Sequence, residues 1–262
     1  MNNQQLYILH FGEQGVQDFV KYSRTAVDHQ PAGASFRDLD FAPPNLGQIK
    51  IDNGANGLVI DHVFSVLGTQ FDKNEGIQVL DINAGLTKEE FVSPEQAHQA
   101  YVELMTKINQ AGWKNYFFRS ALRVSKEDNL KYLLATGDVV NPSYIFSFEE
   151  WKKVIENAPS KSFGYRLYAN GVFLDMSLDK TATTKDGKEQ YMLRYSFQTI
   201  RYFERNMISN SDQMTADELE QAFKQGEIRN KKSREVDERQ AIQEGYRIDE
   251  EYIDPDVWPY VK

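Results

Sequence analysis

The chain has 262 residues, 40% of them hydrophobic and 13% aromatic, which is enough to form a full buried core. Its 39 acidic and 30 basic residues give a net charge of −9, which opposes binding to a nucleic-acid backbone and favours a positively charged protein partner. It contains no cysteine, which excludes disulfides, thiol catalysis and cysteine-ligated zinc or iron–sulfur centres.

Residues 1–140 are predicted to form an N-terminal α+β module. Strands are expected at residues 6–11, 49–52, 57–67 and 77–82. A helix is expected at 12–27, where apolar residues recur at helical spacing. Residues 30–45 are rich in Pro, Gly, Ala and Asp and include Pro43 and Pro44, so they predict a loop.

The helix that begins after Ser93 has the clearest start signal in the chain. Ser93 is a suitable N-cap, and Pro94 occupies the first helical position, where its missing N–H costs nothing. Gln96 can complete a capping box with Ser93. The elements expected next are a strand at 115–124 and a short helix at 125–137.

Residues 141–210 are predicted to form a helix followed by a three-stranded antiparallel meander. A second capping box, Ser147 with Glu150, starts the helix. The Asn-Gly pair at 170–171 is a strong hairpin signal, and residues 185–190 predict a second turn. In the last strand apolar and polar residues alternate, which predicts one buried and one solvated face. The residues expected to be buried there are Tyr191, Leu193, Tyr195 and Phe197.

Residues 211–262 are predicted to form a charged helical arm and an acidic, aromatic tail. Thr215 and Glu218 make a third capping box, and residues 227–245 are interpreted as a surface helix or an ordered arm. The tail, EEYIDPDVWPYV at 250–261, mixes carboxylates with large apolar side chains, and its two prolines favour an extended chain. Such a tail either docks on the protein's own core or is offered to a partner.

Together these elements predict an α+β fold in which antiparallel β-sheet meanders pack against helices, in two βα modules. The apolar runs are far shorter than the roughly 20 residues that span a bilayer, so no transmembrane segment is expected.

The sequence carries no recognisable catalytic motif. The four histidines, His10, His29, His62 and His98, lack the spacing of a metal site. No serine stands in a nucleophile-elbow context, and the glycine-rich nucleotide-binding patterns are absent. Residues 72–76, DKNEG, lack the spaced ligands of a calcium loop and predict a hairpin turn. We therefore expect no catalytic residue, no metal site and no cofactor.

Three segments resemble the immunity proteins, usually lipoproteins, that are encoded beside bacterial type VI secretion effectors. They are SPEQAHQAYVELMTKINQAGW at 93–113, YRLYANGVFLDMSLD at 165–179 and GYRIDEEYIDPDVWPYV at 245–261. The resemblance implies a non-enzymatic protein that binds and blocks a toxin, often in the periplasm. The opening residues, MNNQQ, have neither the basic region nor the apolar core of an export signal. The resemblance and the missing export signal agree if a leader ending in a lipid-bearing cysteine has been lost ahead of Met1. A cytoplasmic location is the alternative.

We therefore expect an immunity or inhibitor protein that neutralises a bacterial effector by steric occlusion. Acidic side chains would steer the partner and aromatic side chains would anchor it. The expected partner-binding residues are Tyr252, Asp254, Asp256, Trp258 and Tyr260. Two alternatives stay open: an enzyme with a carboxylate-based site in a cleft of the sheet, and a scaffold protein that assembles through the charged arm at 227–245.

Overall fold

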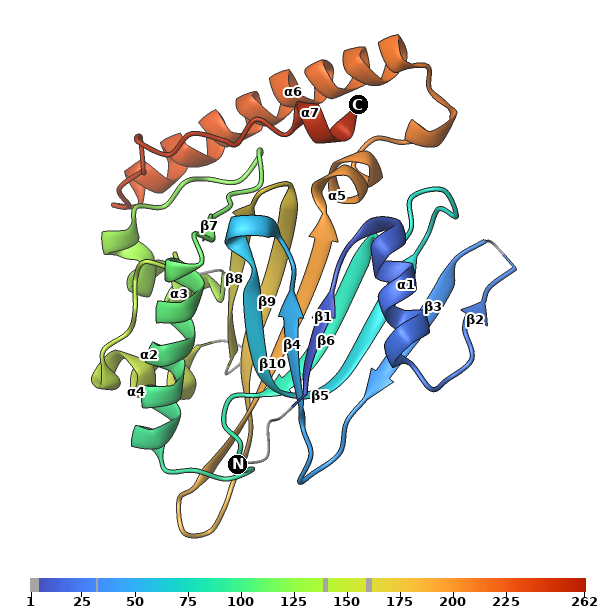
Figure 1. Ribbon diagram of the computed structural model, residues 1–262. Coiled ribbons are helices and arrows are strands. Elements are labelled where there is room, and N and C mark those ends of the chain that lie inside the picture. The colour runs from blue at the N-terminus through green and yellow to red at the C-terminus, as the bar shows by residue number, and fades with distance from the viewer. Residues whose placement is uncertain (1–4, 32, 139–140, 159–161) are drawn as a thin grey trace.

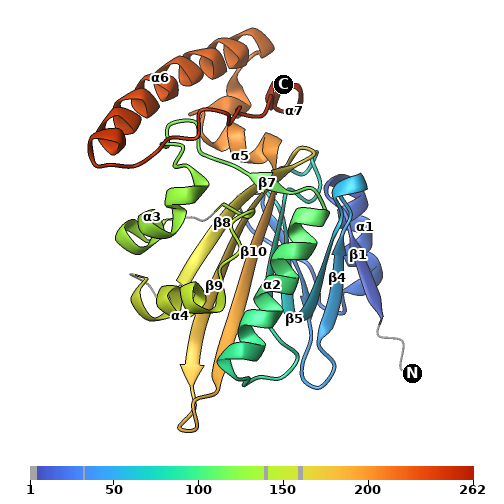
Figure 2. The ribbon, with the colours of Figure 1, turned by 90° about the vertical axis from the view of Figure 1, so that its left-hand side faces the viewer.

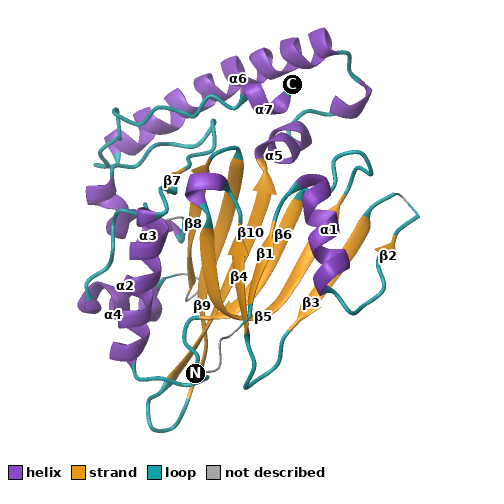
Figure 3. Ribbon diagram, in the orientation of Figure 1, coloured by secondary structure: helices purple, strands orange, loops and turns teal. Residues whose placement is uncertain are grey.

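The computed structural model in Figure 1 describes residues 5–31, 33–138, 141–158 and 162–262. Most of the polar opening MNNQQ and the expected segment boundary at residue 140 therefore lie outside the described residues. A β-sheet forms the centre of the molecule, with helices at its two sides and a helical layer across one end (Figures 1 and 3). The expected α+β class is confirmed.

The described strands form one ten-stranded sheet, antiparallel except where β1 pairs with β4. The strands are β1 (Leu6–Leu9), β2 (Asp28–His29), β3 (Ser35–Asp40), β4 (Gly47–Ile51), β5 (Leu58–Gln70), β6 (Val79–Gly85), β7 (Lys114–Asn115), β8 (Ser162–Ala169), β9 (Val172–Thr183) and β10 (Glu189–Thr199). Their main order is β1-β4-β5-β6-β10-β9-β8-β7, with β3 also on β5 and β2 on β3. Because β6 pairs with β10, one sheet runs through both of the expected segments 1–140 and 141–210.

The three helices for which the sequence predicts a capping box begin at that box. The described helices are α1 (Gly12–Tyr22), α2 (Pro94–Gln110), α3 (Asn129–Thr136), α4 (Phe148–Asn157), α5 (Ile200–Asn206), α6 (Ala216–Gln243) and α7 (Trp258–Val261), with short 3₁₀ turns η1 (Gly54–Asn56), η2 (Lys126–Asp128) and η3 (Ser211–Gln213). Ser93, Ser147 and Thr215 each accept the predicted backbone hydrogen bond, so all three capping boxes are confirmed. The charged segment 227–245 continues α6 rather than forming a separate arm.

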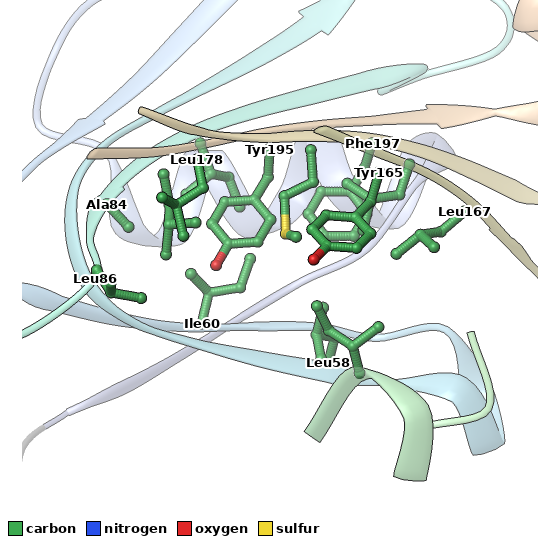
Figure 4. Packing of buried hydrophobic residues seen from close by; sticks show 14 of the residues in the cluster. Leu58, Ile60, Ala84, Leu86, Tyr165, Leu167, Leu178, Tyr195 and Phe197 are labelled. Atoms are coloured by element: carbon green, nitrogen blue, oxygen red, sulfur yellow. The ribbon is translucent and has the colours of Figure 1, made fainter. Parts of the chain in front are cut away.

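Strand β5 bends and folds the sheet over its own core. Its first half pairs with β4 and its second half with β3. Between the halves the register shifts, and His62 adopts a φ of 58°, as in a β-bulge. Figure 4 shows Leu58 and Ile60 of β5 facing Tyr165 and Tyr195 of the opposite strands. Helices α2 and α4 close the side of this core that faces the viewer in Figure 2.

The meander has one buried and one solvated face, as its alternation predicts. Tyr191, Leu193, Tyr195 and Phe197 are all buried. The side chains between them on β10 are only partly buried or exposed, which confirms the predicted pattern. The turn expected at 72–76 is also confirmed, since it joins the antiparallel neighbours β5 and β6.

Two local predictions in the first half of the chain are wrong. Residues 30–45 were expected to be a loop, yet Ser35–Asp40 form β3, and the prolines lie just beyond its end. Residues 115–124 were expected to be a strand, yet only Lys114–Asn115 pair with β8. In the rest of that stretch, the carbonyls of Phe118 and Ala121 accept hydrogen bonds from Arg234 of α6 instead of from a neighbouring strand.

Gly68 lets α1 pack directly onto the sheet, because a Cβ at this position would lie 2.3 Å from Cε2 of the buried Phe19 ring. We expect Gly68→Ala to lower the free energy of unfolding by about 1–3 kcal/mol through overpacking. Gly226→Ala is the matched control, since the nearest atom to its Cβ is 3.9 Å away and α6 gains about 0.5–1 kcal/mol from alanine. Urea unfolding of both variants tests this; native stability of Gly68→Ala would contradict it.

Candidate functional site

The C-terminal tail, residues 246–262, docks on the protein rather than hanging free. After α6 the chain turns back and runs along that helix (Figures 1 and 2). It forms a bridge between Ile248 and Val124 and ends in the one-turn helix α7. The sequence predicts an extended tail throughout, and α7 is a difference. A proline at 259 is tolerated there because it falls in the first turn, whose N–H groups have no helical partner.

Tyr252 and Asp254 anchor the middle of the tail. The Tyr252 hydroxyl accepts a hydrogen bond from the backbone N–H of Phe117 at 3.2 Å, and burial raises the pKa of Tyr252 to about 12. The two Asp254 oxygens accept hydrogen bonds of 2.6 and 3.0 Å from the Arg234 guanidinium. Both of these predicted partner-binding side chains therefore have partners within the protein.

The end of the tail packs into a second, aromatic cluster beneath α6. The Trp258 ring lies 5.1 Å from that of Phe223, and Val257 and Val261 are fully buried. Trp258 therefore also packs on the protein itself. Asp256 accepts a hydrogen bond from the Trp258 backbone N–H and is itself exposed.

Tyr260 lies across the hairpin turn between β8 and β9. A Cβ on Gly171 would lie only 2.4 Å from Cε1 of Tyr260, so the ring rests directly on the glycine backbone. The side chain is nevertheless 40% exposed. Of the three aromatic residues predicted to bind a partner, Tyr260 is the most accessible.

The most exposed large apolar side chain of the tail is Ile253, which our sequence prediction of the site omitted. It is 85% exposed although its neighbours Tyr252 and Asp254 are both held on the protein. In an extended chain successive side chains point to opposite sides, so two inward neighbours force Ile253 outward. Exposed Glu250 and Glu251 precede it. The alternation was readable in the sequence, but which alternate side chains face inward was not.

A pocket of about 580 Å³ lies beside Tyr260 and contains several ionisable groups. The His10 ring is held on both sides, with Nδ1 2.8 Å from Asp18 and Nε2 3.2 Å from Asp52. Arg201 donates to Glu75 at 2.7 Å and to the carbonyl of Val261 at 2.9 Å. These groups are paired with one another, and the pairs connect α1, the sheet and the tail.

The first part of the tail is attached by an ion pair between Arg247 and Asp128. Arg247 donates from Nη2 at 2.6 Å and from its backbone N–H at 2.7 Å. Hydrogen bonds from Arg247 lower the pKa of Asp128 from 3.8 to about 2. Because the pKa is lower in the folded state, this contribution to stability is present above about pH 4 and is lost as the pH falls through about 2.

We therefore expect the hydrogen-exchange protection of the Arg247 amide to fall between pH 4 and pH 2. Asp128→Asn removes the titrating carboxylate, so its Arg247 amide should be less protected at pH 5 and should lack the acid step. Protection factors measured by NMR, which correct for the intrinsic pH dependence of exchange, provide the measurement. An acid step of unchanged size in Asp128→Asn would show that another group holds this part of the tail.

Within the described residues, no group of three or more histidine, aspartate and glutamate side chains is arranged to hold a metal ion. No helix in the described ranges combines the length and apolar character needed to cross a membrane. The site is thus a surface of the docked tail, with Ile253 and Tyr260 exposed among carboxylates. Comparisons of the chain with protein-family models, with curated proteins and with solved structures found no match.

Proposed function

We propose that this protein is a non-enzymatic binding protein, an immunity or inhibitor protein that neutralises a bacterial effector by steric occlusion. The observation that carries the proposal is the docked tail, which holds Ile253 85% exposed between two internally bound residues. An exposed aliphatic side chain on an ordered segment is suited to filling a pocket on a partner.

The ordered conformation of the tail favours tight binding. A flexible segment loses conformational entropy when it binds, and that cost reduces affinity. Here the Tyr252 and Asp254 contacts have already restricted the chain on either side of Ile253. The tail would therefore present its apolar side chain with little further ordering.

The charge around Ile253 suits a basic partner. Glu250, Glu251 and Asp256 are exposed, and the whole chain carries a net charge of −9. Such a field accelerates encounter with a positively charged surface and weakens as salt is added. We propose that Ile253, Asp256 and Tyr260 contact the partner, while Tyr252, Asp254 and Trp258 hold the tail in shape.

The test uses the product of a toxin-like gene adjacent to the gene for this protein. We expect the two purified proteins to form a 1:1 complex in size-exclusion chromatography with light scattering, and the complex to lack the toxin's activity. The association rate should fall as ionic strength rises. Absence of any interaction at micromolar concentration would reject the immunity function.

The same proposal places the mature protein in the periplasm with a lipid anchor, and the cytoplasm is the alternative. Expression of the complete gene, followed by cell fractionation and mass spectrometry of the mature N-terminus, distinguishes the two. A lipid-modified cysteine in the membrane fraction is the expected result. An unmodified protein in the cytoplasmic fraction would contradict it.

A further inference from the structure

A cavity of about 780 Å³ lies between the tail, the start of β7 and the loop before α4. Five asparagines line it: Asn56, Asn109, Asn115, Asn141 and Asn170. Its charged lining residues, Lys114 and Glu251, are both exposed. The wall is therefore dominated by neutral amide groups, which both donate and accept hydrogen bonds.

Four of these amides are held by the protein through one end only, including Asn170, whose Nδ2 donates to Asn53. Nδ2 of Asn56 donates to the carbonyl of Ala111 at 2.8 Å, and Nδ2 of Asn109 donates to the carbonyls of Met105 and Pro142. Oδ1 of Asn141 accepts from the backbone and hydroxyl of Ser143. Within the described chain, the opposite end of each amide makes no hydrogen bond to protein. These bonds fix the orientation of the amides and leave available the carbonyl oxygens of Asn56, Asn109 and Asn170 and N–H groups of Asn56 and Asn141.

Asn115 supplies an independent indication of a ligand. Its Oδ1 atom is buried and has no hydrogen-bond partner among the described residues. A buried acceptor without a partner lowers the stability of the fold. A bound group that donates a hydrogen bond to it would offset that loss. Because Asn115 lines the cavity, rotation of its side chain toward a ligand hydroxyl or N–H would satisfy the atom.

We propose that this cavity binds a neutral saccharide. The unused amide groups of the wall include both carbonyl acceptors and N–H donors, and Asn115 adds a buried acceptor, which favours a ligand whose groups both donate and accept. Sugar hydroxyls each donate and accept, and they carry no charge that would need an ionic partner. Tyr252 and Pro255, both partly exposed, add apolar surface for the C–H face of a sugar ring. The volume lies within the range of about 300–1,000 Å³ that small-molecule sites occupy.

A peptide main chain fits these observations less well. Its donor N–H and acceptor C=O are fixed on separate atoms, so it matches a wall of mixed donors and acceptors less readily than hydroxyls, which can do either. A charged ligand would require a buried counter-ion, and the charged side chains of the lining are at the exposed edge. The saccharide proposal does not depend on the proposed immunity function, because it concerns a different ligand.

The test uses the full chain and a panel of glucose, N-acetylglucosamine, maltose, cellobiose and chitobiose. We expect at least one of these sugars to bind, as seen by saturation-transfer NMR and by titration calorimetry. Asn115→Leu should weaken that binding at least tenfold without lowering the unfolding midpoint, because it removes a buried acceptor that has no protein partner. Asn206→Leu, an exposed position at the end of α5, is the matched control and should bind as the native chain does.

A second variant covers the case in which Asn115→Leu fails to fold. Ser143→Trp places a bulky ring at an exposed position of the lining, outside the core, and should block binding. No binding by any sugar of the panel, or unchanged binding in both variants, would overturn the proposal. Stronger binding of glucuronic acid, of glucosamine or of an alanine tripeptide amide than of every neutral sugar would overturn it as well.

Discussion

Replacing Arg234 with methionine is expected to lower the free energy of unfolding by about 3–5 kcal/mol and to release the tail from α6. Arg234 is 7% exposed, and its guanidinium donates to Asp254 and to the carbonyls of Phe118 and Ala121. The substitution leaves a carboxylate and two backbone acceptors without these donors. Removing Arg234 is costly because the partly buried Asp254 charge and two carbonyl acceptors remain without their donor.

The Arg234 prediction is measured by urea unfolding and by limited proteolysis of the tail. Arg239→Met is the matched control, because Arg239 is exposed on the same helix; its effect should stay within about 0.5 kcal/mol. Adding Asp254→Leu to Arg234→Met should recover part of the lost stability, since it removes the unpaired carboxylate. A loss below about 1 kcal/mol in the single variant would show that the tail is held mainly by its apolar contacts.

Replacing Ile253 with arginine is expected to weaken binding to the partner at least ~100-fold, which corresponds to about 2.7 kcal/mol. The change removes the exposed apolar side chain and adds a positive charge facing a basic surface. Because Ile253 is 85% exposed, the free energy of unfolding should change by no more than about 0.5 kcal/mol. The affinity is measured by calorimetry against the toxin-like product of the adjacent gene.

Val20→Arg is the matched control for Ile253→Arg. Val20 is an exposed aliphatic residue on α1, away from the tail, so the same substitution there should leave the affinity unchanged. If Ile253→Arg binds as tightly as the native chain, the tail is not the binding surface. If Val20→Arg is the weaker binder, the surface lies on α1 and the binding function itself is retained.

The starts of α2, α4 and α6 were predictable from the sequence because a helix cap is a local interaction. Ser93, Ser147 and Thr215 each bond to a backbone N–H three residues away, so the whole motif is visible in four letters. The hairpin at 170–171 is equally local, since the turn type depends on two residues that tolerate positive φ.

Strand β3 and the stretch at 115–124 were mispredicted because their hydrogen bonds are not local. Ser35–Asp40 form a strand because the second half of β5 has a free edge beside them. Phe118 and Ala121 lie outside the sheet because Arg234, more than 100 residues away, supplies their donors. In both segments, the hydrogen-bonding partner cannot be inferred from the amino-acid pattern of the segment itself.

The same distinction between local and non-local interactions applies to the candidate site. The sequence by itself determined that the tail is acidic, aromatic and interrupted by proline, and therefore that it would be a distinctive surface element. Only the tertiary structure decided that Tyr252 and Trp258 face inward and Ile253 outward, because burial of a side chain depends on the groups that it meets. Those groups are Phe117, Arg234 and Phe223, which lie far from the tail in the sequence or on α6 and meet it only in the folded structure.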